Sequence, residues 1–555
     1  MESWASCKAP NEGPGPLTNF AYVVATIEPI ESKEERLAAK GNGVVDGLRD
    51  ATTLWDLTVA RAALTPDSLM LTDEGDRRVT FGGFVAWCER VAAGLLELGI
   101  GPESRVTWQL PTRIETVVLS MALSRLGAVQ NPIIAIYRER EVRACLRQTT
   151  AEWFVILDRW RGFDYRSMAQ AIATDVGGPL RLLSIDEGLP EGDPSRLPPP
   201  PTDGDAVRWI YSTSGTTSEP KGVRHTDETL LAGGRGISDM IQGDSSHVYS
   251  IPFPYAHIGG PDALVHLLDR GLATTLLEAF VPHEAVAVLR RHGVTITGGS
   301  TAFYQALLAE QAKQPDEPIL PALRLLVGGG APKPPELFWR AKHELNAIIV
   351  HGYGMTECPM IANGAPTDPD DALAHADGRP VTGCEIEIRD NIGGVLGPDE
   401  IGDIWVRGPM LCKGYTDPVL TAESFDAAGW FHTGDLGCLT HDGRIALSGR
   451  TKDLIIRKGE NISPREIEDI LAGHPSVAAV AVIGLPDPQS GEHVCAVVET
   501  RHGAPPLTFA EMVRHCREAG LMTQKFPERL EVVDALPRNP TLKILKHELR
   551  ARFAS

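Results

Sequence analysis

The stretch that decides the fold runs from Tyr211 to Gly222 and reads Tyr211-Ser212-Thr213-Ser214-Gly215-Thr216-Thr217-Ser218-Glu219-Pro220-Lys221-Gly222. The run before it, Ala206 to Tyr211, is rich in β-branched and aromatic residues, which predicts a short strand. A turn of hydroxyl residues around one glycine presents backbone N–H groups and hydroxyls to a single concavity, and the lysine adds a positive charge. Such a loop suits a chain of phosphates.

The stretch differs from the phosphate-binding pattern G-x-x-x-x-G-K-[ST], because Gly222 follows Lys221 where that pattern has a hydroxyl residue. Clusters of Ser, Thr and Gly are also typical of solvated surface loops. That is the alternative interpretation of this stretch taken alone, and the segments around it decide between the two.

Working outward toward the N-terminus, helical and strand patterns alternate. The expected elements are helices from Thr53 and from Thr80 to Gly99, strand Arg105–Leu110, buried helix Glu115–Leu126, and strands Ala128–Asn131 and Trp153–Leu157. This alternation predicts a parallel sheet with helices on both faces. Residues 1–45 have the pattern of an irregular leader, and the proline-rich residues 187–205 predict a stiff connector.

Toward the C-terminus the alternation resumes with the 211–222 loop and predicts a second doubly wound unit. Its expected elements are helix Thr229–Ile241 and strands His247–Ile251, Ala273–Leu277, Val294–Thr297, Leu323–Val327 and Ala347–Val350. Beyond Ala376 we expect no helices but a small barrel of short strands at Gly383–Arg389, Gly402–Val406 and Gly443–Ser448. After Arg450 the pattern predicts a compact α+β unit with helices at Pro464–Ala472 and Leu507–Glu518.

Composition narrows the function classes. A chain of 555 residues exceeds one hydrophobic core, so at least two domains are expected. A formal net charge of −20 argues against broad nucleic-acid binding. The nine cysteines contain no C-x-x-C pair, which indicates a reduced intracellular chain. We find no apolar run long enough to span a membrane and no secretory signal, so we expect a cytoplasmic enzyme with no integral membrane segment.

Chemistry-bearing residues follow several of the expected strands. His257 follows a strand end, at the edge where such sheets bind ligands. Glycines in Gly328 to Pro332 and in His351 to Glu357 let the backbone approach a flat ring, on which Tyr353 can stack. Glu357 can hold a hard cation through oxygen. Asp435, in His432-Thr433-Gly434-Asp435, offers a carboxylate to ribose hydroxyls.

Five motifs together resemble those of the adenylate-forming acyl-CoA synthetases, in order and in spacing. They are Tyr211 to Gly222, Tyr353-Gly354-Met355-Thr356-Glu357, Thr433-Gly434-Asp435, Gly449-Arg450-Thr451-Lys452-Asp453, and Pro537-Arg538-Asn539-Pro540-Thr541-Leu542-Lys543. The resemblance extends from about residue 50 to the C-terminus, and it is closest to ligases of cyclohexanecarboxylate-like and medium-chain acids.

The resemblance implies an α/β fold in two parts. Residues 46–449 would form a large N-terminal domain of two doubly wound subdomains and a small β-barrel. Residues 450–452 would form a hinge, and residues 453–555 a small mobile α+β C-terminal domain. The implied reaction joins a carboxylic acid to ATP, giving acyl-AMP and pyrophosphate, and then to coenzyme A, with Mg²⁺ required. The small-molecule partners would be the acid, ATP and CoA, and a homodimer is compatible with this family.

The resemblance also implies a role for each matching residue. The catalytic groups would be Lys543, Glu357, Thr213 and Lys221, with Thr216 and Glu357 at the metal and Lys452 at the hinge. The ATP and AMP site would comprise Thr213, Ser214, Gly215, Thr216, Thr217, Lys221, Gly329, Gly330, Ala331, Pro332, His351, Gly352, Tyr353, Gly354, Met355, Thr356, Asp435, Arg450 and Lys543. The acyl pocket would comprise His257, Ile258, Phe303, Gly328 and Gly330, and CoA would meet Lys458, Gly459 and Glu460.

Each assignment has a plainer alternative. Lys543 is alternatively one more exposed lysine, His257 a core hydrogen-bonding residue, Glu357 a solvated acid, and Asp435 with Arg450 an ion pair at a domain seam. Two positions depart from the family pattern, Ser218 and Leu542, where glycine is usual. At Leu542 we expect an extended backbone that tolerates the side chain.

The residues expected around the acyl group are mostly small or apolar, which predicts a monocarboxylic acid with an apolar body. The resemblance of residues 109–141 to ligases of cyclohexanecarboxylate-like and medium-chain acids implies an alicyclic, medium-chain or sterol-side-chain acid. Three other functions remain open: a ligase that loads a carrier protein, a luciferase-like oxygenase, and a non-catalytic acyl-nucleotide binding protein.

Overall fold

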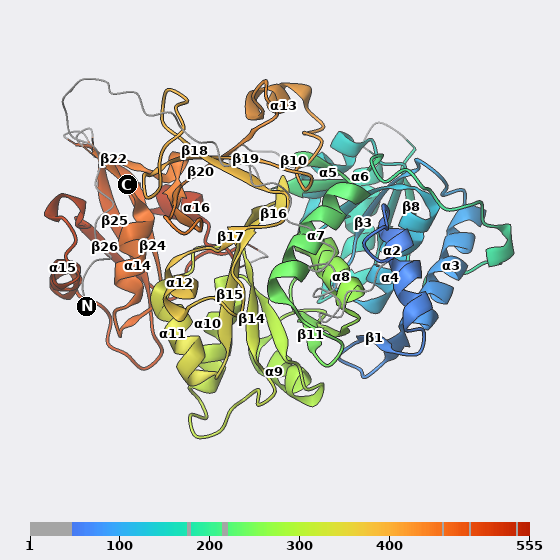
Figure 1. Cartoon of the computed structure of the whole chain (residues 1–555), viewed down its shortest axis with the longest axis horizontal. Helices are drawn as coiled ribbons and strands as arrows, with labels where there is room; N and C mark the ends of the chain where they lie inside the picture. The colour runs from blue at the N-terminus through green and yellow to red at the C-terminus, as the bar shows by residue number, and fades with distance from the viewer. Residues whose placement is uncertain are drawn as a thin grey trace, which may run out of the picture.

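The computed structural model describes residues 47–174, 179–213, 220–457, 460–487, 490–539 and 542–554. In Figure 1 the described residues of the first half of the chain, in blue to green, lie to the right, and the C-terminal sheet and its helices, in orange and red, lie to the left. Two large sheets with their helices make up the centre and right of this view, and a four-stranded sheet, a five-stranded sheet and a two-stranded hairpin complete the described part.

The first large sheet has the strand order β10-β9-β4-β3-β5-β8. Its strands β3, β4, β5, β8 and β9 are parallel, and only β10 runs antiparallel, as the partner of β9. The strands are β3 (Arg105–Gln109), β4 (Val129–Ile133), β5 (Trp153–Ile156), β8 (Arg181–Ser184), β9 (Val207–Thr213) and β10 (Lys221–Thr226). The helices of this part are α3 (Phe81–Glu97), α4 (Ile114–Leu126), α5 (Glu139–Thr149) and α6 (Tyr165–Ala173), and the hairpin β6 (Arg159–Trp160) and β7 (Phe163–Asp164) precedes α6.

This sheet corrects one sequence-based expectation. The strand before the phosphate-loop stretch, β9, pairs with β4 of the first sheet, so it does not begin the second unit. Strand pairing across more than 70 residues depends on tertiary packing, and Trp209 is buried in the same core cluster as Trp108. Helices α5 and α6 were also not predicted.

The second large sheet has the order β17-β16-β15-β14-β13-β11-β12-β1-β2. Strands β1 and β2 of this sheet come from the start of the described chain, and β1 pairs in parallel with β12. The strands are β1 (Leu69–Thr72), β2 (Arg78–Thr80), β11 (Val248–Ile251), β12 (Ala273–Leu276), β13 (Ile296–Gly299), β14 (Leu325–Gly329), β15 (Ile348–Met355), β16 (Cys358–Asn363) and β17 (Arg379–Pro380). The helices of this part are α9 (Pro282–Arg291), α10 (Thr301–Gln311), α11 (Pro335–Glu344) and α12 (Asp370–His375).

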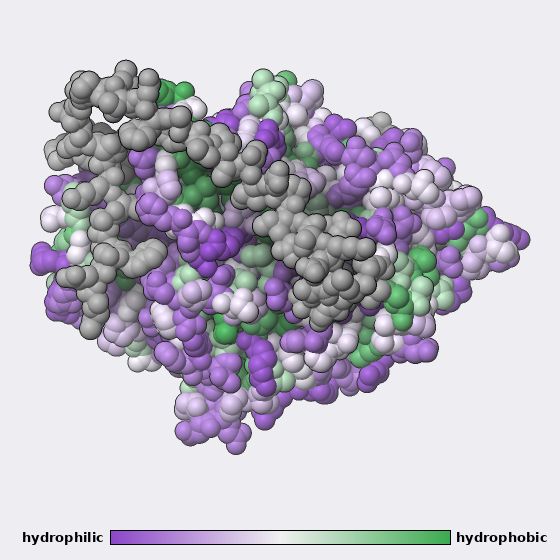
Figure 2. Space-filling model, in the orientation of Figure 1, coloured by the Kyte–Doolittle hydropathy of each residue, from purple (hydrophilic) through white to green (hydrophobic). Residues whose placement is uncertain are grey.

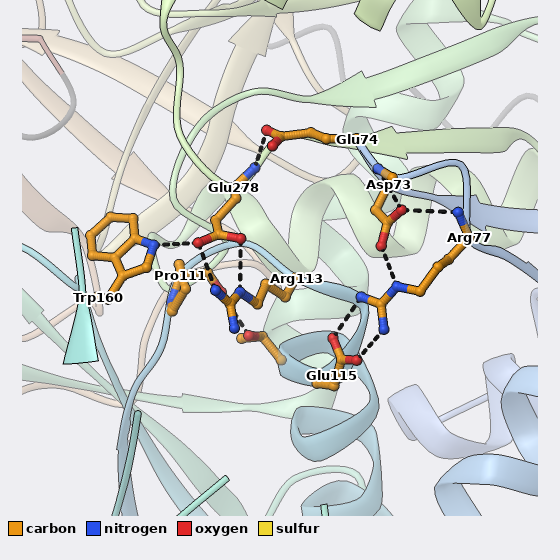
Figure 3. Close-up of polar contacts among 10 residues, drawn as sticks. Asp73, Glu74, Arg77, Pro111, Arg113, Glu115, Trp160 and Glu278 are labelled. Carbon is orange, nitrogen blue, oxygen red and sulfur yellow. Dashed lines mark hydrogen bonds and ion pairs between the residues drawn. The ribbon is translucent and has the colours of Figure 1, made fainter. Parts of the chain in front are cut away.

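Helices and ion pairs join the two large sheets. Helix α7 (Asp227–Ile241) contacts β9 and β10 of one sheet and β16 of the other, and it packs on α8 (Gly259–Arg270), which contacts α2 (Leu54–Leu64). Figure 3 shows the second connection, at the carboxyl ends of the strands. Arg113, before α4, makes two hydrogen bonds of 2.8 Å to Glu278, after β12, and Arg77 pairs with Glu115 at 2.5 Å. These contacts fix the two strand edges relative to each other.

The third sheet follows the second large sheet and has the order β18-β19-β20-β21. It comprises β18 (Glu385–Arg389), β19 (Gly402–Arg407), β20 (Phe431–Leu439) and β21 (Ile445–Arg450). In the described residues its end strands β18 and β21 do not pair, so the expected small barrel is an open antiparallel sheet. The expectation that helices are absent here was wrong, because α13 (Pro418–Ser424) begins with Pro418 after the capping residue Asp417.

The last described part is the predicted α+β unit. Strands β22 (Ile455–Arg457), β23 (Glu460–Ile462), β24 (Val477–Asp487) and β25 (Gly491–Thr500) form a sheet in the order β23-β22-β25-β24, and β26 (Arg529–Val533) pairs with β25. Its helices are α14 (Pro464–Ala472), α15 (Phe509–Glu518) and α16 (Lys546–Phe553). Short 3-10 turns lie at η2 (Pro194–Arg196), η3 (Thr451–Asp453) and η4 (Thr523–Lys525).

Figure 2 shows hydrophilic side chains over much of the coloured surface of this face, with hydrophobic ones in smaller patches between them. Within the described residues, we find no helix with the length and apolar character needed to cross a bilayer.

Candidate active site

Lys543 from the C-terminal part lies at the carboxyl edge of the second large sheet. A Cβ atom placed on Gly330, after β14, would lie 3.2 Å from Cε and 3.5 Å from Nζ of Lys543. Burial and then the positive charge of Arg450 lower the pKa of Lys543 to about 8, against the opposing effect of Asp435 and Glu357. The lysine therefore sits among three of the other predicted site residues and is not a free surface lysine.

Asn539 holds the backbone of Leu542 and Lys543. The N–H of Leu542 donates to the carbonyl of Asn539, and the N–H of Lys543 donates to Oδ1 of Asn539, each at 2.8 Å. Leu542 has a φ of +62°, so the expected extended backbone was wrong. Left-handed backbone costs a leucine about 1–2 kcal/mol. The Leu542 side chain packs against the hydrophobic cluster built around α10 and α11, which offsets this strain by docking this residue on the large domain.

The side chain of Tyr415 contacts both Glu357 and Lys221. The hydroxyl of Tyr415 donates to Oε1 of Glu357 at 2.7 Å, and Nζ of Lys221 lies 5.4 Å from the centre of the Tyr415 ring. Thr213 pairs with Lys221 across β9 and β10, so both ends of the phosphate-loop hairpin lie beside the Glu357 turn. Sequence reasoning missed Tyr415, which has no motif of its own.

Asp435 is held by two groups. Nε of Arg450 lies 2.8 Å from Oδ1, and the hydroxyl of Tyr353 donates to Oδ2 at 2.8 Å. Asp435 is buried, and its backbone pairs with Arg450 in β20 and β21. The structure thus brings together the three residues predicted for the nucleoside, with the Tyr353 hydroxyl directed to the carboxylate.

The predicted adenine slot is formed by two adjacent strand ends. Gly328 pairs with His351 and Gly329 with Gly352 in β14 and β15. Nε2 of His351 donates to the carbonyl of Ala331 at 3.0 Å, which links the two segments. Burial lowers the pKa of His351 to about 4, so the ring is neutral at pH 7. Gly354 and Met355 continue β15, and Pro332 follows Ala331 at the exposed rim.

His257 and Phe303 flank the edge predicted for the acyl group. The N–H of Gly259 donates to Nδ1 of His257 at 3.2 Å, which leaves the proton of the neutral ring on Nε2. Burial and then the charge of Lys543 lower the pKa of His257 to about 4. Phe303 is buried, with its ring 4.7 Å from that of Phe280, and Ile258 is buried in the central core.

Several predicted site residues lie outside the described part of the chain. They are Ser214, Gly215, Thr216, Thr217, Lys458 and Gly459, together with Ser218. Glu460 begins β23, and its backbone pairs with Arg457.

The residues present fit a nucleotide-bound magnesium ion. In the described ranges no group of three or more His, Cys, Asp or Glu side chains gathers as a cation cage. Mg²⁺ that arrives on substrate phosphates needs only one or two protein carboxylates. Glu357 fits this role, since it is buried, adjoins the phosphate-loop hairpin, and engages only Oε1 with Tyr415 among the described contacts.

Gly330 has no side chain and so leaves room for the end of Lys543. A substitution at Gly330 tests whether Lys543 occupies this place. Gly330→Ala should lower the rate of adenylate formation by roughly 3-fold to 10-fold, because the new methyl displaces the end of the lysine by a few tenths of an ångström. Pyrophosphate-exchange rates would measure the loss. Gly429→Ala is the matched control, since Gly429 has nearly the same φ (+81° against +78°) and has no atom within 4 Å of a new Cβ. Equal rates for the two variants would contradict this seating of Lys543.

Known proteins share both parts of the chain. The family profile described as AMP-binding enzyme matches residues 59–416, and that of the AMP-binding enzyme C-terminal domain matches residues 466–543. The medium-chain fatty-acid–CoA ligase of Escherichia coli is 30% identical over 98% of this chain and 96% of its own length. The salicyl-AMP ligase / salicyl-S-ArCP synthetase of Mycobacterium tuberculosis is 30% identical over 87% of this chain and 88% of its own.

Solved structures of related enzymes have a similar fold. ATP-bound MatB from Rhodopseudomonas palustris has a TM-score of 0.79 at 26% identity, covering 91% of this chain and 99% of that one. The o-succinylbenzoate CoA synthetase MenE from Bacillus subtilis, in complex with its acyl-adenylate, has a TM-score of 0.76 at 27% identity, covering 90% and 98%. The fold is that of ligases that form adenylates. The chain belongs to the AMP-binding enzyme family and is an adenylate-forming ligase. AMP-binding ligases use ATP and Mg²⁺, and the CoA ligases among them use coenzyme A.

Proposed function

We propose that this protein is an acid–thiol ligase that converts an apolar monocarboxylic acid to its acyl-AMP and then to its CoA thioester. The position of Lys543 carries the proposal, because a lysine from the C-terminal part reaches Gly330 and shares its surroundings with Glu357 and Asp435. A non-catalytic nucleotide-binding protein has no need of that arrangement.

Adenylation brings a carboxylate to the α-phosphate of ATP, so negative charge builds on oxygens that must meet cations. In this proposal Lys543 donates to the α-phosphate and to the carboxylate of the acid. Lys221 and the backbone N–H groups after Thr213 would hold the departing pyrophosphate, and Glu357 would hold the magnesium ion, which supplies Lewis acidity when bound. Asp435 would accept from ribose hydroxyls while Arg450 and Tyr353 fix its orientation.

Coenzyme A is the acceptor in this proposal, because the medium-chain fatty-acid–CoA ligase of Escherichia coli, which aligns with 98% of this chain, is named for it. The alternative acceptor is a carrier protein, because the salicyl-AMP ligase that this chain resembles is also named for a carrier.

The second half-reaction requires the C-terminal part to move, and we propose residues 450–452 as its hinge between domains at 46–449 and 453–555. On the N-terminal side Arg450 pairs with Asp435, and Thr451 donates to Asp403 at 3.0 Å. On the other side Asp453 pairs with Arg550 of α16 at 2.8 Å. Lys452 lies between these two anchored segments, where a change of backbone angles would swing one domain against the other.

The activity should depend on the charge of Lys543 in a pH-dependent way. Its pKa of about 8 means that the free enzyme loses this positive charge as pH rises through 8, so kcat/KM for ATP in adenylation should fall above that pH. Lys543→Arg keeps its charge and should abolish the alkaline fall, even if its maximal rate is lower. A pH profile of pyrophosphate exchange for both proteins checks this, and an unchanged alkaline limb in the arginine variant would assign the titration to another group.

The proposed function itself is tested with a panel of alicyclic, medium-chain, sterol-side-chain and aryl acids. Each acid is supplied with ATP and Mg²⁺, with and without CoA, and pyrophosphate and acyl-CoA are measured. Acid-dependent pyrophosphate release together with acyl-CoA formation supports the ligase. Release of pyrophosphate without any thioester in the presence of CoA would instead favour a carrier protein as acceptor.

A further inference from the structure

His225 is a fully buried histidine on β10, four residues after Lys221. Its Nε2 lies 2.7 Å from the carbonyl oxygen of Thr356, and its Nδ1 lies 2.8 Å from Oγ1 of Thr229. A carbonyl oxygen only accepts, so the ring proton is on Nε2 and is donated to Thr356. The Thr229 hydroxyl then shares its single proton between Nδ1 and the carbonyl of Thr226, which lies 2.9 Å from Oγ1. Burial lowers the pKa of His225 to about 4, which agrees with this neutral form.

The residue that His225 holds belongs to the turn that carries the candidate metal carboxylate. Thr356 and Glu357 are the two residues between β15 and β16, because Met355 pairs with Cys358. On the other side of this turn, the N–H of Cys412 donates to the Glu357 carbonyl at 2.8 Å, and Tyr415 donates to its carboxylate. His225 therefore supplies the contact that fixes the turn from the side of β10.

Strand β10 is the common support of these contacts. Lys221 and His225 point to the same side of the strand, since side chains alternate along it. The N–H of Arg224 donates to the carbonyl of Gly414 at 2.9 Å, and the N–H of Thr416 donates to that of Gly222 at 2.8 Å. Strand β10 thus contains Lys221 and His225, and its backbone is hydrogen-bonded to the segment that contains Tyr415.

We propose that His225 is a positioning residue that sets the Glu357 carboxylate at the distance from the phosphate-loop hairpin that a nucleotide-bound divalent cation requires. The inference rests on the proposed function, because it takes Glu357 to be the residue that meets the cation. His225 itself touches neither nucleotide nor metal. The rival role is purely structural, in which His225 ties β10 to β15 and has no effect on the cation.

The two roles differ in what happens to nucleotide binding with and without Mg²⁺. We would titrate the non-cleavable analogue α,β-methylene-ATP by calorimetry, once in EDTA and once in saturating Mg²⁺. Outer partners of metal ligands typically matter by about 10-fold to 100-fold. His225→Leu should reduce the Mg²⁺-dependent gain in affinity by this factor and change the affinity in EDTA by a much smaller factor. His225→Gln, whose amide reaches the Nε2 position, should restore most of the gain.

His266→Leu is the matched control, because His266 is equally buried and lies on α8, with its Nδ1 3.2 Å from Ser238. It should lower thermal stability without changing the Mg²⁺-dependent gain. If His225→Leu does not fold, His225→Asn replaces it, since its shorter amide reaches only the Nδ1 position. A normal Mg²⁺-dependent gain in the leucine or asparagine variant, or a glutamine variant no better than leucine, would overturn the proposal.

The wild-type protein separates this inference from the proposed function. If wild type forms acyl-AMP but His225 variants keep the full Mg²⁺-dependent gain, only the role of His225 is lost. If wild type binds the analogue no more tightly with Mg²⁺ than in EDTA and forms no adenylate, the proposed function fails and the positioning role fails with it.

Discussion

Lys543→Ala should reduce the rate of adenylate formation by about 10²–10³, or roughly 3–4 kcal/mol, because it removes a cation aimed at the charge that develops on the α-phosphate. The loss should be confined to that half-reaction. When acyl-AMP is supplied, no pyrophosphate has to leave, so the α-phosphate no longer needs the charge of Lys543. Thioester formation from synthetic acyl-AMP should therefore continue at a rate near that of wild type. Pyrophosphate exchange measures the first step, and chromatography of acyl-CoA the second.

Lys546→Ala is the matched control for this variant. Lys546 lies three residues further along the same segment, at the start of α16, and pairs with Glu468 at 2.7 Å within the C-terminal part. It should retain both half-reactions. If Lys543→Ala lost both half-reactions equally, the role of Lys543 would not be confined to adenylation. That result would contradict the proposal that the C-terminal part takes one position for adenylation and another for thioester formation.

Local sequence signals predicted those parts of the fold that local forces determine. Helix α14 was predicted with its observed bounds, because Pro464 at the first turn and an apolar stripe mark it regardless of its neighbours. Strand β9 was recognised as a strand but assigned to the wrong unit, because its partner β4 lies far back in the chain. Which sheet a strand joins depends on non-local packing that no short window contains.

The same division applies to the candidate site. Glycine-rich and acidic motifs identified segments that the structure does bring together, including Gly330, Asp435 and Lys543. Sequence reasoning missed Tyr415 and His225, since their partners lie 58 and 131 residues away. A histidine on the strand immediately after Pro-Lys-Gly was the only available signal. The usual glycine at position 542 was a signal for left-handed backbone, but the sequence did not reveal the cluster on the large domain that compensates the strain of Leu542.

Glu357→Gln should lower adenylation by roughly a hundredfold or more, close to the effect of removing one well-aimed charge in a catalytic site. Glutamine keeps the size of the side chain and an oxygen that accepts from Tyr415, but it loses the negative charge that a magnesium ion requires. Excess Mg²⁺ should therefore recover only part of the rate. Rates of pyrophosphate exchange across a magnesium titration measure both effects.

Three comparisons make the Glu357 result specific. Glu400→Gln changes an exposed acid of the third sheet and should be neutral. Glu357→Asp keeps the charge on a shorter arm and should respond to added Mg²⁺ more strongly than the glutamine variant does. Tyr415→Phe removes the donor to Oε1 and should cost about 10-fold through misplacement of the carboxylate. A glutamine variant with wild-type magnesium dependence would place the cation on residues other than Glu357, and the reaction's charge balance would then rest on Lys221 and Lys543.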